Sequence, residues 1–205
     1  GTDSAAGPGV TSVTISAAGA AASKGLFKAG MCVLDEAFAV LLYELATRID
    51  PFPGQYKPTD TGSDGPSVAA ALKLLGLAAS YSHAFSLAAL KSAIVSGPAM
   101  WGTTFLASME TPGGDGVLVV DPSSGVVGGH EMVITGFDVA TGLWTVDNSW
   151  GTSWGLSGSC LVRDADMGYL LSQHGDITIP NYGIVPAPPT PVPSVASAQQ
   201  LWDAQ

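Results

Sequence analysis

GGHEMVITGFD, residues 128–138, and LWTVDNSWGTSWG, residues 143–155, decide how this chain folds. Both begin as short runs rich in β-branched and aromatic residues, and a polar turn separates them, which predicts two strands of a hairpin. His130 stands at the start of the first strand and Asn148 at the end of the second. A hairpin would bring these two side chains to one edge of a sheet, where an amide can orient an imidazole for proton transfer.

Helices are predicted in the first half of the chain. Between Met31 and Ile49, apolar residues at 34, 38, 41, 42, 45 and 49 follow one helical stripe, and DPFPG at 50–54 ends it. Cys32 therefore opens a helix in this reading. Two shorter helices are expected over 68–77 and 86–95.

Strands are predicted in the second half. Short runs rich in Val, Ile, Thr, Trp and Phe, separated by Gly and Asp turns, occupy residues 99–109, 116–121, 130–138, 143–150 and 157–165. Cys160 lies inside the last of them and is expected in the core of the sheet. Helices followed by strands indicate an α+β fold.

Composition narrows the class of protein. The 205 residues are 46% hydrophobic and only 12% charged, with a formal net charge of −10, which is typical of a globular protein. Without a basic patch to neutralise phosphates, nucleic acid is not an expected partner, and neither is a membrane surface. Every apolar stretch is shorter than the ~20 residues of a membrane span, and no signal peptide is visible, so localisation is left open. No ligand spacing for a metal is found.

Three segments are expected. Residues 1–23 are read as an N-terminal extension and 24–180 as the folded domain, with helices over about 24–96 and strands over about 97–180. Residues 181–205 are rich in proline and are read as a tail.

Three residues suggest nucleophilic chemistry. A thiol acts as a nucleophile in its thiolate form, which a helix N-terminus stabilises, and this is the position predicted for Cys32. An imidazole can take the thiol proton and deliver it to a leaving amine, provided that a third group orients the ring. His130 and Asn148 fit these two roles.

The second half resembles the papain-like cysteine peptidases, most closely small divergent forms from bacteria and their phages. GGHEMVITGFD, DNSWGTSWG and SGSCLV carry the likeness, and DNSWGTSWG is highly specific. The resemblance implies Cys32 as nucleophile, His130 as base and Asn148 as its partner. It also implies supporting roles for Trp150, which would shield the His–Asn hydrogen bond, and for Gly129.

TGSDGPSVAAALKLLG, residues 61–76, resembles the family's substrate-binding loop and the helix after it. Gly62, Ser63, Asp64 and Gly65 are the substrate-binding residues this implies. The resemblance implies a two-lobed α+β fold for this chain, with a helical left lobe, a small antiparallel β-barrel right lobe and a cleft between them. It also implies that the protein needs no cofactor and acts on a polypeptide.

Two departures from the family pattern keep other functions open. Leu26 stands where the family usually has a glutamine of the oxyanion hole, and Asp35 and Glu36 closely follow Cys32. One alternative is therefore a papain-fold protein without activity that serves as a structural or binding component, for example of a phage particle. A second is a cell-wall amidase of Cys/His type, acting on peptidoglycan peptides; its mark would be cleavage of peptidoglycan in place of protein.

Overall fold

The hairpin predicted from residues 128–155 is present in the computed structural model, which describes residues 12–182. Strand β5 (Val126–Asp138) pairs antiparallel with β6 (Leu143–Asp147), and β6 pairs with β7 (Ser159–Arg163). Alternate residues of β5 and β6, such as Met132, Ile134, Trp144 and Val146, are buried, as expected for strands with one face on a core.

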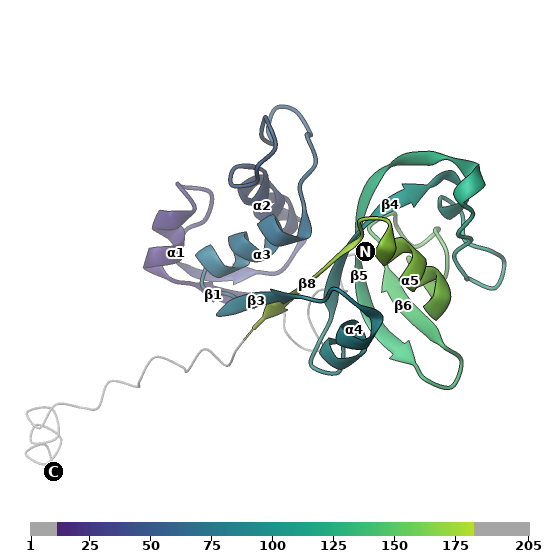
Figure 1. Cartoon of the computed structure of the whole chain (residues 1–205). Coiled ribbons are helices and arrows are strands. Elements are labelled where there is room, and N and C mark those ends of the chain that lie inside the picture. Colours follow the sequence, from purple (N-terminus) through teal and green to yellow (C-terminus); the bar gives the residue numbers. More distant parts are fainter. Residues whose placement is uncertain (1–11, 183–205) are drawn as a thin grey trace, which may run out of the picture.

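Three further strands complete an antiparallel sheet. They are β4 (Ala99–Leu106), β8 (Asp176–Asn181) and β3 (Ser80–His83), and the six strands lie in the order β3-β8-β4-β5-β6-β7 (Figure 1). Strand β4 is therefore flanked by β5 and β8. The strand predicted over 116–121 is absent, because this segment makes only an isolated bridge from Val117 to Leu161.

Helices α4 (Leu87–Ala93) and α5 (Asp164–Ser172) pack with the sheet around one hydrophobic cluster. Trp101, Trp144, Met167 and Cys160 lie in this cluster, and the prediction that Cys160 belongs to the strand core is confirmed. Ser86 caps α4 by accepting the N–H of Ala89, which fixes where this predicted helix begins. We call these strands and helices the sheet lobe.

A second cluster forms in the helical lobe, which contains β1 (Ser12–Ile15), α1 (Ala17–Ala22), β2 (Gly30–Val33), α2 (Glu36–Thr47) and α3 (Gly65–Leu74). Residues 12–23, which the sequence reading places in an extension, form β1 and α1 and contribute Ile15 to this core. Residues 1–11 and 183–205, which include nearly all of the expected tail, lie outside the described residues.

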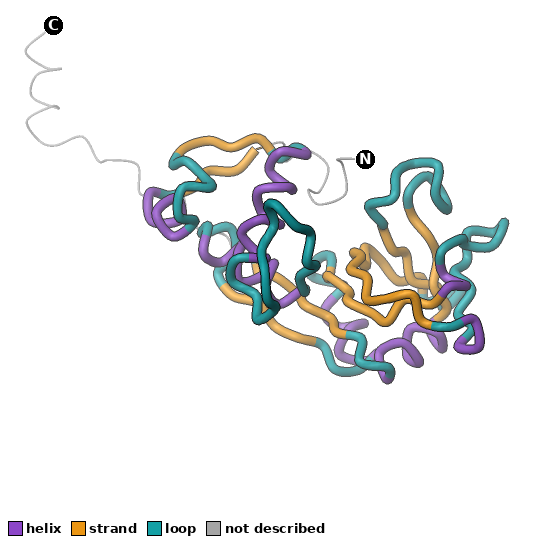
Figure 2. The backbone as a smooth tube through the Cα atoms, turned by 90° about the horizontal axis from the view of Figure 1, so that it is seen from above, coloured by secondary structure: helices purple, strands orange, loops and turns teal. Residues whose placement is uncertain are grey.

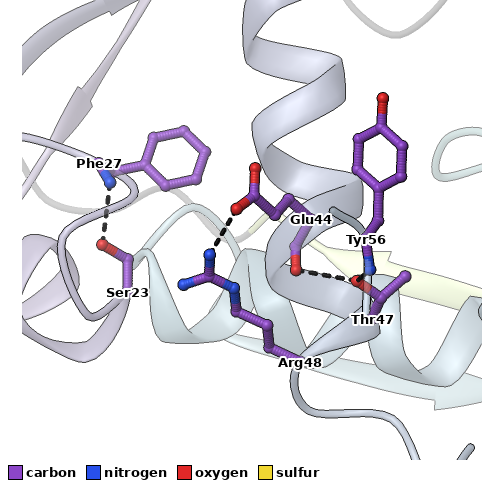
Figure 3. Close-up of polar contacts among 6 residues, drawn as sticks. All are labelled: Ser23, Phe27, Glu44, Thr47, Arg48 and Tyr56. Carbon is purple, nitrogen blue, oxygen red and sulfur yellow. Dashed lines mark hydrogen bonds and ion pairs between the residues drawn. The ribbon is translucent and has the colours of Figure 1, made fainter. Parts of the chain in front are cut away.

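Polar contacts hold the end of α2 and the segment after it (Figure 3). The Thr47 hydroxyl donates to the carbonyl of Glu44 at 3.1 Å and accepts the N–H of Tyr56 at 3.0 Å. Arg48 forms an ion pair with the carboxylate of Glu44. These contacts are largely shielded from water, so they tie the segment after α2 to the helix.

Helix α3 connects the two lobes. It contacts α2 in the helical lobe and β3, β4 and β8 in the sheet lobe. The β1–β2 pair is a separate small sheet in the helical lobe, apart from the six-stranded sheet (Figures 1 and 2). Within the described ranges, no helix has the length and apolar character needed to cross a membrane.

Candidate active site

His130 and Asn148 meet as the hairpin predicts. The Nε2 atom of His130 lies 2.9 Å from Oδ1 of Asn148, and the backbone N–H of Ser149 donates to the same oxygen at 2.8 Å. An amide oxygen only accepts hydrogen bonds, so this contact assigns the proton of a neutral ring to Nε2. The Nδ1 atom is then left as the basic nitrogen, as a general base requires.

Aromatic rings surround this pair. The ring of Trp150 lies 4.9 Å from that of His130, and Phe105 approaches His130 edge-on at 4.9 Å. Trp154 packs on Trp150 at 5.6 Å, and its indole N–H donates to the carbonyl of Glu110 at 2.8 Å. These contacts restrict the orientation of the imidazole and cover part of it with apolar surface.

A pocket of about 230 Å³ opens beside the histidine. Its wall consists of Phe105, Glu110, Val127, Gly128, Gly129, His130 and Trp150. A Cβ atom on Gly128 or Gly129 would meet nothing within 4 Å, so the backbone of β5 is open here. An extended peptide could lie along it.

The prediction that Cys32 opens a helix is wrong. Cys32 lies in β2, paired with Val13 of β1, and α2 begins only at Glu36. The reason is local competition for the helix start: the side chain of Asp35 accepts the N–H of Phe38 at 2.9 Å and takes the N-cap position. The helix N-terminus is thus occupied by a carboxylate.

The structure does not bring Cys32 to His130. The cysteine packs against the core of the helical lobe, and its Sγ atom has only a weak contact, 3.8 Å, with the carbonyl of Val33. The strands that carry Cys32 and His130, β2 and β5, belong to different sheets and pack on different hydrophobic clusters. Leu26, at the usual glutamine position, also packs against the helical core.

The expected substrate-binding residues lie at the start of α3. Gly62 has a positive φ of 77°, Asp64 caps the helix by accepting the N–H of Ser67 at 2.8 Å, and Gly65 is buried. The hydroxyl of Ser63 is buried without a partner. These residues do not line the pocket beside His130. Gly65 instead faces the sheet lobe, whereas Gly62 is exposed.

There Gly65 and Asp64 lie close to two carboxyl groups that the sequence analysis missed, Glu131 and Asp176. Burial, then the charges of Asp176 and Asp64, raise the pKa of Glu131 to about 8. Burial also raises the pKa of Asp176. The sequence did contain a signal for Glu131, because a glutamate directly follows His130 in an otherwise apolar strand.

Other candidates for chemistry are weaker. Cys160 is fully buried, and burial followed by the charge of Asp147 raises its pKa to about 12, so it is a poor nucleophile. Among residues 12–182, no group of His, Cys, Asp and Glu side chains is arranged to hold a metal ion.

Part of this chain matches a known protein family. A family model described as papain family cysteine protease matches residues 67–173, just over half of the chain. No curated protein sequence matches. Similar solved structures include xylellain, a cysteine protease from Xylella fastidiosa, at 20% identity and a TM-score of 0.46, where the match covers 78% of this chain and 59% of that one.

Two plant enzymes are also similar. The match to the bromelain protease from Ananas comosus has 21% identity and a TM-score of 0.38 and covers 49% of each chain. The match to a cysteine protease from Carica candamarcensis has 17% identity and a TM-score of 0.40, and it covers 51% of this chain and 49% of that one. In all three comparisons, less than two thirds of the solved chain is matched.

Proposed function

Because this chain belongs to the papain family of cysteine proteases, we propose that it is a peptidase that hydrolyses peptide or isopeptide bonds through a thioester on Cys32. The observation that carries the proposal is the hydrogen bond of 2.9 Å between His130 and Asn148. It orients the imidazole and leaves Nδ1 as the acceptor for a thiol proton.

In the proposed reaction, His130 takes the proton of Cys32, and the thiolate attacks the carbonyl carbon of the scissile bond. The C–N bond then breaks, and His130 delivers the proton to the leaving amine. Water, deprotonated by His130, attacks the thioester, which releases the carboxylic acid and restores the thiol. Asn148 orients the ring throughout, and Trp150 and Gly129 support it as parts of the histidine pocket.

This chemistry requires Cys32 and His130 to meet, so the helical lobe must move relative to the sheet lobe from the arrangement in this structure. The substrate would be a polypeptide lying along Gly128 and Gly129, where the strand backbone is open. We propose the loop of Gly62, Ser63, Asp64 and Gly65 as a second place of contact with the substrate. Peptidoglycan stem peptides are a further class to be tested.

Hydrolysis of fluorescently labelled casein, of stem peptides and of an isopeptide-linked conjugate tests the proposal. We expect Cys32→Ala and His130→Ala to abolish turnover and Asn148→Ala to leave a remnant, because packing by aromatic rings still orients the imidazole in part. His174→Asn is the matched histidine control and should keep full activity. Turnover that survives Cys32→Ala would exclude the thioester.

A second candidate is a papain-fold binding protein without peptidase activity. It is favoured by the position of Cys32 in β2 and by Asp35 at the helix cap. The alkylation rate of Cys32 by iodoacetamide at pH 6, compared between the wild type and His130→Ala, separates the two. A tenfold slower reaction in the variant would show that imidazole and thiol pair, whereas equal rates with no turnover would favour the binding protein.

A further inference from the structure

Two carboxyl groups face each other across a glycine in the middle of the sheet. Gly102 of β4 is the registered partner of Glu131 on β5 and of Asp176 on β8. Side chains of registered neighbours point to the same face of a sheet. Since Gly102 has no side chain, both carboxyl groups lean over it: a Cβ there would lie 2.7 Å from Oε2 of Glu131 and 2.7 Å from Oδ2 of Asp176. The two oxygens are therefore at most twice that distance apart.

The first residue of α3 covers the same two groups. A Cβ on Gly65 would lie 2.6 Å from Oε1 of Glu131 and 3.2 Å from Oδ1 of Asp176. Asp64, the cap of α3, precedes this glycine and brings a third carboxyl group. Asp64, Glu131 and Asp176, which we call the junction carboxylates, thus meet where the helical lobe rests on the sheet lobe.

No cation is paired with the junction carboxylates in the described part of the chain. The ion pairs among residues 12–182 are Glu44–Arg48, Lys91–Asp164 and Arg163–Asp166, and none of them involves a junction carboxylate.

The elements packed around the junction carboxylates offer few groups that could offset their negative charge. Strand β8 supplies Thr178, whose hydroxyl donates to Asp176 at 3.3 Å, and β3 supplies His83, whose Nδ1 lies 3.1 Å from that hydroxyl. Strand β4 contributes Gly102, which has no side chain. The carboxylate of Asp64 accepts the N–H of Ser67. Oε1 of Glu131 is buried without a hydrogen-bond partner. An ionised Glu131 would therefore add a second buried charge with nothing to neutralise it.

We propose that the junction carboxylates form a proton-dependent contact between the lobes, in which a protonated Glu131 keeps α3 docked on the sheet and its ionisation loosens α3. The raised pKa of Glu131, about 8, supports this because the group would then titrate in neutral to mildly basic solution. Because α3 links the lobe of Cys32 to the lobe of His130, the same proton would influence how the two lobes are placed. The contact does not depend on the chain being a peptidase.

Hydrogen exchange of the full chain between pH 6 and 9.5, corrected for the intrinsic pH dependence of exchange, tests the proposal. In the wild type, protection of the α3 amides should fall by at least about tenfold over this range, while those amides of β6 and β7 that exchange through local opening keep theirs. In Glu131→Gln the α3 profile should be flat. Glu36→Gln, the same chemical change at an exposed site on α2, should behave as the wild type.

Asp176→Asn provides a second and independent variant. Removal of this neighbouring charge lowers the pKa of Glu131, so the loss of α3 protection should move to lower pH. A flat wild-type profile, an unchanged loss in Glu131→Gln, or an equal loss in every strand and helix would each overturn the proposal.

Discussion

Alkylation should distinguish the two cysteines by a large factor. Cys160 is fully buried in β7, and burial together with the charge of Asp147 raises its pKa to about 12. At pH 8, a thiol with this pKa is ionised in roughly one molecule in ten thousand, whereas an ordinary thiol of pKa about 8.5 is ionised in about a quarter. Ionisation alone therefore makes Cys160 about 2,000-fold slower than free cysteine, before exclusion of the reagent from the core is considered.

The assay is a time course with iodoacetamide at pH 8, followed by mass spectrometry of the peptides containing Cys32 and Cys160. Because Cys32 lies in a peripheral strand and is partly accessible, it should be modified while Cys160 is still intact. In denaturant, where neither thiol is buried, both should react at similar rates. Modification of native Cys160 within about tenfold of Cys32 would refute the burial and the pKa on which this reasoning rests.

Other predictions concern stability. Gly19→Ala should lower the free energy of unfolding by about 2 kcal/mol, because its Cβ would lie 2.7 Å from the carbonyl oxygen of Leu75, while Gly128→Ala, which meets nothing within 4 Å, should be neutral in the same urea titration. Trp144→Phe should cost about 2 kcal/mol in urea unfolding, because it removes a buried indole whose N–H donates to Asp164 at 3.0 Å. The pKa of Glu131 is higher in the folded state, so stability should fall as pH rises from about 4.5 to about 8, by at most about 5 kcal/mol. In thermal melts, Glu131→Gln should not lose stability over this pH range. A variant whose melting temperature follows that of the wild type at every pH would contradict the attribution of the loss to Glu131.

The local pattern of the sequence was sufficient for the hairpin and for the meeting of His130 with Asn148. Strand alternation and a short turn set the β5–β6 register, and little else is needed because the two strands are adjacent in the chain. Apolar stripes likewise predicted the bodies of α2, α3 and α4. The predicted starts of α2 and α3 were wrong, because Asp35 and Asp64 take the cap positions of these helices. The α+β class followed from these elements.

Tertiary structure decided the place of Cys32 and the existence of the junction carboxylates. Cys32 joins a strand because residues 12–15 pair with residues 30–33, and because Asp35 takes the cap position of the next helix. Glu131 and Asp176 meet only because β4 pairs with both β5 and β8, the latter more than 70 residues away along the chain. Periodicity reports on one segment at a time, whereas such contacts depend on which distant segments pack together, and this is settled by the burial of the whole core.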